Sequence, residues 1–505
     1  MAGDILTREQ RDGLAMSSVQ RSILFSAADR YGSVVLVFVA TAILARLLSP
    51  AEFGVYAVVN AVTTVMGASF LEFGGGNYLI QKRELSTADI RSAFTITLGI
   101  SVAIALLLFV LAGALSELFA QDSLKRGIEV SALNFVLVPF HGTISALLRR
   151  DMKFGTLAVC NFATGAATAL ASIVLAMAGF SYMAPIWGGL AGSIVFTVML
   201  LASHRDWSAL RLSLLEHREI VNFGLYSSAV SVINLFYNLA PQLFLAKVLD
   251  FGSVGLYSRA INLTQMFDRL VAQVLNPVIM PAIVAQRRAG ADLKAVYLEA
   301  IQLLSAVQWP FLIFVALMAR PIVLVWLGQT WLEIVPLVRI LCIANLALFA
   351  ACLTYPVFLA VGSVRDALVS SLISLPPSLL VVLCASFFGV EAVTGAALAT
   401  LPFQTAVVIY FLKRHLAFSS GEFFRASLKS GLVTFVMAPG VLGCAALTEA
   451  GMLTSLTGLI LSFPIAGLGW WCGLIMTGHP LLHQLRDVAG GLLRSAPRLR
   501  PSRPA

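Results

Sequence analysis

The stretch ARLLSPAEFGVYAVV, residues 45–59, has a counterpart two hundred residues later in AKVLDFGSVGLYSRA, residues 246–260. A shift of 201 residues makes five pairs coincide: Ala45 and Ala246, Arg46 and Lys247, Leu48 and Leu249, Gly54 and Gly255, and Tyr56 and Tyr257. Both copies lie in a short turn between two long apolar segments. We interpret the pair as a repeat of one group of helices; the alternative is that Gly-x-Tyr corners recur by chance in a glycine-rich membrane protein.

The composition predicts a membrane protein. Of the 505 residues, 59% are hydrophobic and 12% are charged, whereas a soluble domain has roughly 25% charged residues. Apolar segments long enough to cross about 30 Å of hydrocarbon as helices recur along the chain, without the two-residue alternation of a barrel strand. The sequence therefore predicts an all-α polytopic membrane protein with about 14 transmembrane helices. The expected spans are residues 19–48, 54–79, 92–116, 127–148, 154–178, 182–203, 220–249, 255–285, 295–319, 332–361, 367–389, 391–412, 428–448 and 453–477.

The basic residues predict the orientation of these spans. Of the 34 lysines and arginines, 25 fall in the segments on the same side as the N-terminus, and five fall on the other side. Because cytoplasmic loops carry the excess of basic residues, both termini are expected in the cytoplasm. The net charge of +9 is then a topology signal, and we expect no nucleic-acid partner.

The repeat divides the chain into two pseudo-symmetric six-helix lobes around a central cavity, which is the architecture of a transporter. An even number of spans in each lobe relates the lobes by an axis along the membrane normal. The expected parts are an N-lobe (1–203), an amphipathic interfacial linker (204–219), a C-lobe (220–415), two extra C-terminal spans (416–477) and a basic cytoplasmic tail (478–505).

The corner and its surroundings resemble the polysaccharide (oligosaccharidyl-lipid) flippases of the multidrug/oligosaccharidyl-lipid/polysaccharide (MOP) exporter superfamily. The resemblance rests on the first corner, on LEFGGGNYLIQKREL (residues 71–85) and on VGLYSRAINL (residues 254–263). It implies alternating-access movement of undecaprenyl-pyrophosphate-linked oligosaccharide repeat units across the bacterial inner membrane, from the cytoplasmic to the periplasmic leaflet. The implied setting is O-antigen or exopolysaccharide biosynthesis, with membrane lipids, a polymerase and chain-length proteins as partners.

Polar residues inside the spans are the candidates for substrate binding, because an arginine in mid-membrane usually faces a cavity or a partner. Residues 259–276 carry an expected unbroken polar stripe along one helix face. Arginine binds phosphate bidentately and keeps its charge, while amides suit a sugar. The candidates for the phosphates are Arg30, Arg259 and Arg269, and those for the sugar are Asn234, Asn262, Gln265 and Gln273. The alternative is that these arginines pair with acids and hold the lobes together; Arg259, close to a membrane edge, could also reach the interface.

Three acids lie within the expected spans: Asp29, Glu72 and Asp268. They either couple transport to an ion or form ion pairs between helices, and the ion pairs are the favoured reading. All six cysteines lie in apolar runs and are expected to pack there. The chain shows no metal-ligand cluster, nucleotide-binding loop or nucleophile–base pair, so neither a cofactor, a metal nor enzymatic activity is expected.

Three rival functions remain open. A cation-coupled drug exporter of the same superfamily needs an acidic cavity, whereas the expected stripe carries arginine. A membrane-embedded polymerase or ligase usually has a large loop outside the membrane, and every such loop expected here is short. A lipid II flippase is the closest rival. Such flippases carry an added pair of helices beside a groove for the lipid tail, and the two extra C-terminal spans expected here keep this rival open.

Overall fold

The computed structural model describes residues 31–71, 76–82, 84–203, 207–213, 235–269, 292–361 and 363–486. Contacts between residues divide the chain into two compact units. Unit 1 comprises Met1–Asn262, Trp326–Ile334 and Leu379–Val393, and unit 2 comprises Leu263–Val325, Val335–Ser378 and Thr394–Ala505.

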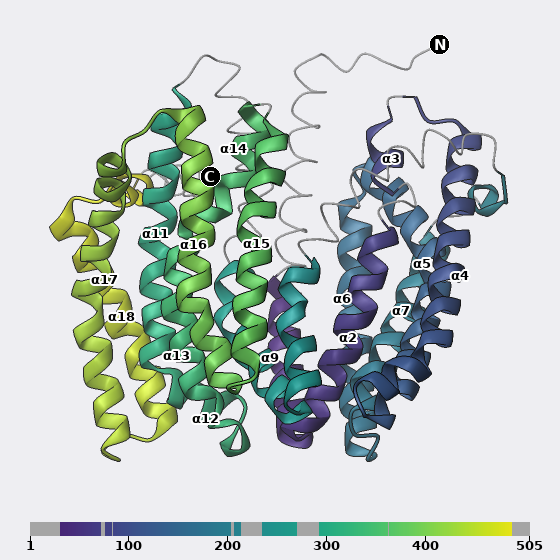
Figure 1. The fold of residues 1–505 in the computed structure, drawn as a ribbon, viewed down its shortest axis with the longest axis horizontal. Helices are drawn as coiled ribbons and strands as arrows, with labels where there is room; N and C mark the ends of the chain where they lie inside the picture. The colour runs from purple at the N-terminus through teal and green to yellow at the C-terminus, as the bar shows by residue number, and fades with distance from the viewer. Residues whose placement is uncertain are drawn as a thin grey trace, which may run out of the picture. The chain divides into compact units, whose positions relative to one another are not determined.

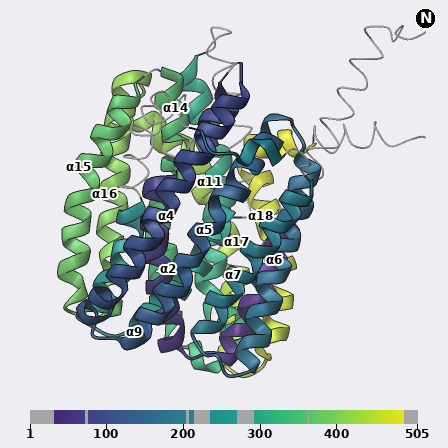
Figure 2. The same ribbon diagram turned by 90° about the vertical axis from the view of Figure 1, so that its right-hand side faces the viewer.

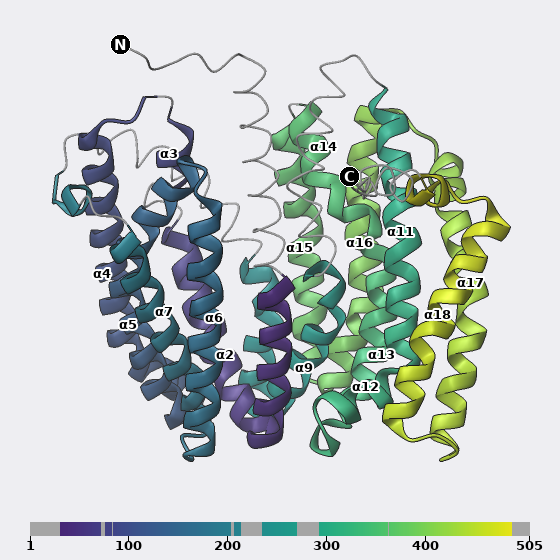
Figure 3. The same ribbon diagram turned by 180° about the vertical axis from the view of Figure 1, so that it is seen from behind.

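Unit 1 is a group of helices from the first half of the chain together with the second copy of the corner (Figures 1 and 3). Its elements are an apolar helix at Tyr31–Leu47, α2 (Pro50–Leu71), α3 (Gly76–Gln81), α4 (Thr87–Leu118), α5 (Asp122–Arg150), α6 (Phe154–Met177), α7 (Met183–Ser203), the 3-10 turn η2 (Trp207–Leu210), helical residues 235–248, the 3-10 turn η4 (Gln329–Trp331) and most of α9 (Phe251–Thr264). Figure 2 shows α4, α5 and α7 running side by side.

Unit 2 contains most of the second half of the chain. Its elements are α11 (Leu293–Leu317), α12 (Ala319–Trp326), α13 (Ile334–Asn345), the 3-10 segment η5 (Leu346–Leu353), α14 (Thr354–Val361), most of α15 (Val364–Ser386) and α16 (Val390–Leu416), α17 (Ser420–Glu449) and α18 (Ser455–Thr477). In Figures 1 and 3, α17 and α18 lie against each other and beside α11.

The prediction of an all-α membrane protein is confirmed. Within the described ranges, nine helices are long and apolar enough to cross a membrane. The ends of some agree closely with the expected spans, as in α6 (Phe154–Met177) against 154–178 and α18 (Ser455–Thr477) against 453–477, whereas α17 (Ser420–Glu449) begins well before the expected 428. The total of 14 spans stays a prediction, because parts of the first, seventh and eighth lie outside the described residues.

The expected span 332–361 is wrong as a single helix. The chain forms α13, then the 3-10 segment η5, then α14. Two side chains donate to carbonyl groups of η5: Trp309 Nε1 to Leu346 O at 2.9 Å and Thr405 Oγ1 to Ala347 O at 3.0 Å. A 3-10 turn frees carbonyls that an α-helix would use internally, and a membrane tolerates this where neighbouring helices supply the donors.

The expected amphipathic linker helix is also wrong over the residues that the structure describes. Residues 207–210 form only the 3-10 turn η2, and residues 211–213 form no helix. The backbone N–H of Ser213 donates to Thr95 Oγ1 on α4 at 2.8 Å, so the linker is tied to the bundle here. The remainder of the linker lies outside the described residues.

Glycine brings helices into close contact within each unit. A Cβ on Gly188 of α7 would lie 2.0 Å from Ser172 Oγ on α6, and a Cβ on Gly473 of α18 would lie 2.9 Å from Val433 Cα on α17. Without a hydrophobic force to join helices in lipid, such small residues allow the backbones to approach and gain van der Waals contact. The pairs α6–α7 and α17–α18 therefore each form a tight helical hairpin.

Candidate functional site

The two copies of the repeat corner have the same backbone structure. The first copy has helical residues up to Leu47 and a new helix from Pro50, and the second has helical residues up to 248 and a new helix from Phe251. The last turns also agree, with Leu48 N–H bonded to Leu44 O and Leu249 N–H bonded to Leu245 O, both at 2.9 Å. The repeat read from the sequence is therefore present in the fold of the corner.

Different residues cap the new helix in the two copies. In the first, Ser49 N–H donates to Glu52 Oε2 at 2.7 Å, and Glu52 N–H faces Ser49 Oγ at 3.4 Å. In the second, Asp250 is the cap, and its carboxylate accepts from the backbone N–H and the hydroxyl of Ser253 at 2.8 and 2.9 Å. The carboxylate has exchanged places with the hydroxyl, yet both patterns satisfy N–H groups at the start of a helix.

The two corners contact each other through their glycines, and α2 and α9 lie side by side in Figures 1 and 3. A Cβ on Gly54 would lie 1.6 Å from the carbonyl oxygen of Phe251, and a Cβ on Gly255 would lie 1.9 Å from that of Pro50. The contact is reciprocal, because the same 201-residue shift relates Gly54 to Gly255 and Pro50 to Phe251. Only glycine allows this approach. We call this contact the glycine crossing.

Arg259 lies within this contact region. Its side chain is only 8% exposed, and its guanidinium carbon lies 3.8 Å from the centroid of the Phe53 ring, which itself is 2% exposed. This is a cation–π contact between the second copy of the corner and the first. The contact joins two helices through an aromatic ring and not through an acid, so both the expected contact with a substrate phosphate and the alternative ion pair stay predictions.

The expected polar stripe on residues 259–276 is interrupted. Helix α9 ends at Thr264, Gln265 lies in a turn, and residues 268–269 belong to a wider π-type turn. Arg269 N–H donates to Gln265 O at 3.2 Å, which is the four-residue spacing of an ordinary α-helical bond. Gln265 is exposed, while Asn262 and Arg269 are half-buried. Wider turns of this kind are frequent at functional sites, and sequence periodicity alone predicts an unbroken helix here.

Asp268 belongs to this turn and is half-buried. Among the described residues, no lysine, arginine or histidine lies within ion-pair distance of its carboxylate. The expected inter-helix ion pair at Asp268 thus stays a prediction. Five further predicted site residues lie outside the described residues: Arg30, Asn234, Gln273, Asp29 and Glu72.

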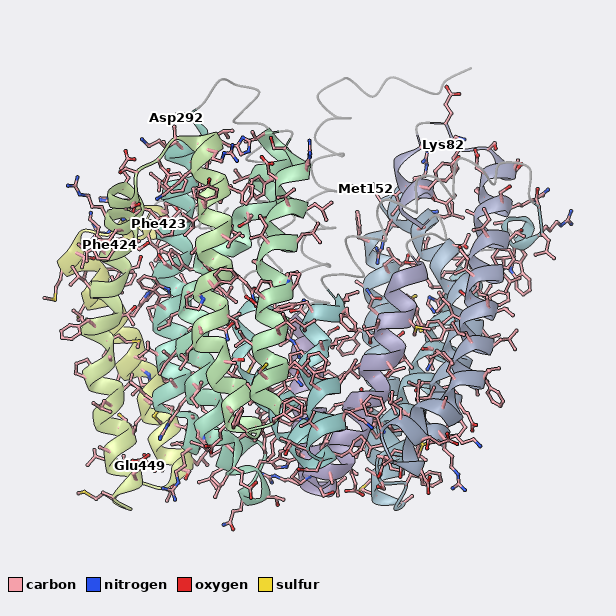
Figure 4. The ribbon with its side chains drawn as sticks, in the orientation of Figure 1. Lys82, Met152, Asp292, Phe423, Phe424 and Glu449 are labelled. Carbon is pink, nitrogen blue, oxygen red and sulfur yellow. The ribbon has the colours of Figure 1, made fainter. Side chains whose placement is uncertain are left out.

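A buried charged cluster, which the sequence reasoning missed, ties α3, α4 and α5 at the end of unit 1 opposite the corner. Asp89 is 2% exposed, and it accepts hydrogen bonds from Lys82 Nζ at 2.9 Å and from Tyr78 Oη at 3.2 Å. Arg150 donates to the carbonyls of Leu79 and Lys82 at the end of α3, at 2.8 and 2.5 Å. The signal in the sequence is the Ser86-x-x-Asp89 capping box. In Figure 4, Lys82 and Met152 mark this end of unit 1.

A buried neutral cluster joins three helices of unit 2. His479, which is fully buried, faces Ser430 Oγ at 3.2 Å, and Ser305 Oγ donates to Ser430 Oγ at 2.8 Å. Burial lowers the pKa of His479 to about 4, and the charge of nearby Lys429 adds to the shift. These contacts join α11 to α17 and to the end of α18. Within the described ranges no group of three or more metal-ligating side chains occurs.

The comparisons with known structures identify the class of fold. The lipid II flippase MurJ, in an inward closed conformation, superposes with a TM-score of 0.74 over 91% of this chain and 100% of that one, at 15% identity. An inward-facing multidrug resistance transporter of the MATE family, from the MOP superfamily, superposes with a TM-score of 0.60 over 80% and 98% of the two chains, at 13% identity. The fold is that of the MOP-superfamily membrane transporters.

The sequence comparisons identify the family. Residues 43–336, which include both copies of the corner, match a family described as polysaccharide biosynthesis protein. The chain belongs to this family of membrane proteins.

Three bacterial relatives agree with this assignment. The succinoglycan biosynthesis transport protein ExoT of Rhizobium meliloti is 26% identical over 67% of this chain and 68% of its own length. The lipopolysaccharide biosynthesis protein WzxC of Escherichia coli K12 is 21% identical over 60% of this chain and 62% of its own. A membrane protein of the cps region of Klebsiella pneumoniae is 23% identical over 64% and 67% of the two chains. The matches thus span about two thirds of each relative.

Proposed function

We propose that the protein is a flippase that moves undecaprenyl-pyrophosphate-linked oligosaccharide repeat units from the cytoplasmic to the periplasmic leaflet of the bacterial inner membrane. The observation that carries the proposal is the family match over residues 43–336. It is supported by relatives whose names refer to lipopolysaccharide biosynthesis and to succinoglycan transport. Both termini are cytoplasmic in this proposal, and a polysaccharide polymerase and chain-length proteins act on the product.

The proposed mechanism is alternating access. The glycine crossing supports it, because the two repeats contact each other there through backbone atoms, and this contact can act as a pivot. The chain passes from one unit to the other at several positions. Two of these positions lie next to features that weaken a helix. One is Leu263, next to the end of α9, and the other is the junction after Ser378, which follows Pro376 and Pro377 in α15. Proline and wide turns are common causes of helix bending.

The proposed substrate contacts follow the polar residues near the break in α9. Arg269 binds the pyrophosphate, and Gln265 and Asn262 bind the sugar; Gln265 is exposed and the other two are half-buried. Arg30, Asn234 and Gln273 complete the proposed set, while Arg259 acts mainly through its contact with Phe53. The intramembrane acids Asp268, Asp29 and Glu72 form ion pairs between helices in this proposal, and coupling of transport to an ion at one of them is the alternative.

A second candidate function is the transport of lipid II. The TM-score of 0.74 with MurJ favours it, as do the helices α17 and α18, which follow the twelve spans of the two proposed lobes. The identity of 15% makes this a likeness of fold. We therefore keep lipid II as the alternative substrate.

Lipid analysis of a deletion strain tests the proposal. The strain should accumulate undecaprenyl-pyrophosphate oligosaccharides on the cytoplasmic side while peptidoglycan synthesis continues, and the wild-type gene should reverse this. Arrest of peptidoglycan synthesis, with accumulation of lipid II, would favour the second candidate. Sensitivity to cationic drugs without lipid-linked sugar would replace both with an exporter.

The same strain tests the proposed site. Arg269→Ala should fail to complement at normal protein levels, because it removes the charge proposed to hold the pyrophosphate. Arg339→Ala is the matched control, because Arg339 is an exposed arginine that pairs with Glu449, at 3.1 Å. Full complementation by Arg269→Ala would remove this residue from the site.

A further inference from the structure

The connection between α11 and α13 is long in comparison with its counterpart in the first repeat. Three residues, 119–121, join α4 to α5, whereas residues 318–333 join α11 to α13 and contain α12 and η4. Residues Trp326–Ile334 are grouped with unit 1, although the chain before and after them belongs to unit 2. We call Trp326–Ile334 the strap.

Two tryptophans attach the strap to the helix Tyr31–Leu47. Trp326 Nε1 donates to Phe38 O at 3.0 Å, and its ring stacks on the Phe38 ring with centroids 4.4 Å apart and planes 6° apart. Trp331 Nε1 donates to Ala45 O at 2.7 Å. The two acceptors are seven residues apart, which is about two helical turns, so both indoles lie along one face of this helix.

Trp331 also supports the glycine crossing. Its ring meets the Phe53 ring edge-on, with centroids 5.4 Å apart. Arg259 lies over the same Phe53 ring, so Phe53 is in contact with both the strap and α9, one residue before Gly54. Trp331 and the last strap residue, Ile334, are completely buried. The strap therefore packs directly behind the place where the two repeats contact each other.

Gly328 gives the strap its path between the two tryptophans. Its φ of +99° is in the region that only glycine adopts readily. A Cβ at this position would lie 3.9 Å from Arg46 Cγ. The turn thus directs Trp326 and Trp331 onto the same helix and brings the strap beside Arg46, one of the residues matched between the two copies of the corner.

We infer that the strap stays closed on the first repeat throughout the transport cycle and that Trp331 is a positioning residue for the glycine crossing. This inference rests on the proposed function. Release of the strap would expose two buried indoles and leave two N–H donors without their acceptors, which is costly. The chain instead bends at the ends of the strap, where it passes between the units.

A disulfide between Arg46→Cys and Gly328→Cys tests the inference in the membrane. The Gly328 Cβ position lies 3.9 Å from Arg46 Cγ, so the side chains of cysteines at these two positions lie within reach of each other. The oxidised double variant should complement the deletion strain within twofold of its reduced form. Loss of complementation on oxidation, restored by a reductant, would show that the strap has to open. Failure to cross-link under an oxidant would show that the two positions do not stay together, and would equally overturn the inference.

The single variants and Gly328→Ala are assayed first, because they separate backbone strain at Gly328 from the effect of the cross-link. If neither these nor the wild type relieves the accumulation of lipid-linked sugar, the proposed function is wrong. If the single variants complement and only the oxidised pair fails, the inference on the strap alone is wrong.

Trp331→Phe and Trp331→Ala provide a second measurement that needs no cross-link. Phenylalanine keeps a ring against Phe53 and loses the N–H donor, whereas alanine loses both. At equal protein levels in the membrane, complementation should fall at least tenfold for Trp331→Ala and about threefold for Trp331→Phe. Equal and full activity of both variants would remove the positioning role from Trp331.

Discussion

The two copies of the repeat corner have the same backbone and different side chains. The residue that follows the shared tyrosine by two positions is Val58 in the first copy and Arg259 in the second. Val58 is completely buried, whereas Arg259 extends over Phe53 of the other copy. Backbone contact at the glycines constrains both copies equally, and the residues around it are free to differ. The symmetric part of the corner thus sets the fold, and the asymmetric part adds a specific contact.

The polar clusters of the two units differ in charge. In unit 1, the ion pair of Lys82 and Asp89 joins the end of α3 to α4, and Arg150 adds α5. In unit 2, the neutral contacts of His479, Ser430 and Ser305 join α11, α17 and the end of α18. A buried charge requires a partner, whereas a buried imidazole can remain neutral. The stability of the two units should therefore respond differently to pH.

The largest expected effect is at the glycine crossing. Gly54→Ala or Gly255→Ala should destabilise the protein by roughly 4 kcal/mol or more, because the added methyl group overlaps a backbone carbonyl that a rotamer change does not move. Thermal unfolding in detergent, with the amount of membrane-inserted protein, measures this. Gly113→Ala in α4 is the control, since no atom lies within 4 Å of its Cβ position. Unequal effects at Gly54 and Gly255 would contradict the reciprocal contact.

Acid should weaken unit 2 through His479. Its pKa is about 4 in the folded protein and 6.5 ordinarily, so the unfolded chain binds the proton first as the pH falls. The stabilising contribution is complete above pH 6.5 and is lost as the pH falls through 4, about 3 kcal/mol in total at 1.36 kcal/mol per pKa unit.

Unfolding temperatures at pH 7 and pH 5, compared between the wild type and His479→Gln, measure the part of this contribution that is lost by pH 5. The variant should lose this part of the pH dependence. His483→Gln changes an exposed histidine four residues later and should keep it. An unchanged pH dependence in His479→Gln would place the acid sensitivity elsewhere.

The contact between Arg259 and Phe53 should contribute a smaller amount. A double-mutant cycle of Arg259→Met and Phe53→Leu should give a coupling of about 1 kcal/mol in unfolding free energy, because a desolvated cation–π contact has roughly this strength. Methionine keeps most of the apolar stem and removes the charge. A coupling near zero, with loss of transport in Arg259→Met, would return Arg259 to the set of substrate contacts.

The smallest effects are expected at two helix ends, one in each unit, where a residue other than glycine has a positive φ. Met152 follows α5 with a φ of +56°, and Ala417 follows α16 with a φ of +49°. Met152→Gly and Ala417→Gly should each raise the unfolding free energy by about 0.5–1 kcal/mol, because the left-handed conformation strains a residue with a Cβ. Ala426→Gly, inside α17, should lower it by about 1 kcal/mol. Destabilisation by both turn variants would show that the Cβ contacts outweigh the strain.

Much of the fold could be predicted from the sequence, and less of the site. Long apolar segments place helices such as α6 and α18 within one or two residues, because a membrane span needs a minimum length of apolar residues. Periodicity could not locate η5 or the turn at Gln265, because both depend on donors and packing from other helices. The sequence marks Arg259 as a polar residue inside a span, but its contact with Phe53, 206 positions away, leaves no polar signal in the sequence.

The sequence by itself determined the all-α membrane fold and the repeat of the corner, since hydrophobic length and matched residues are local properties of the chain. Only the tertiary structure decided that Gly54 and Gly255 contact each other's helix, that the strap joins the first repeat, and that His479 is buried. These features depend on which backbone surfaces approach each other. Such an approach is decided by packing between distant segments, which no short stretch of the sequence encodes.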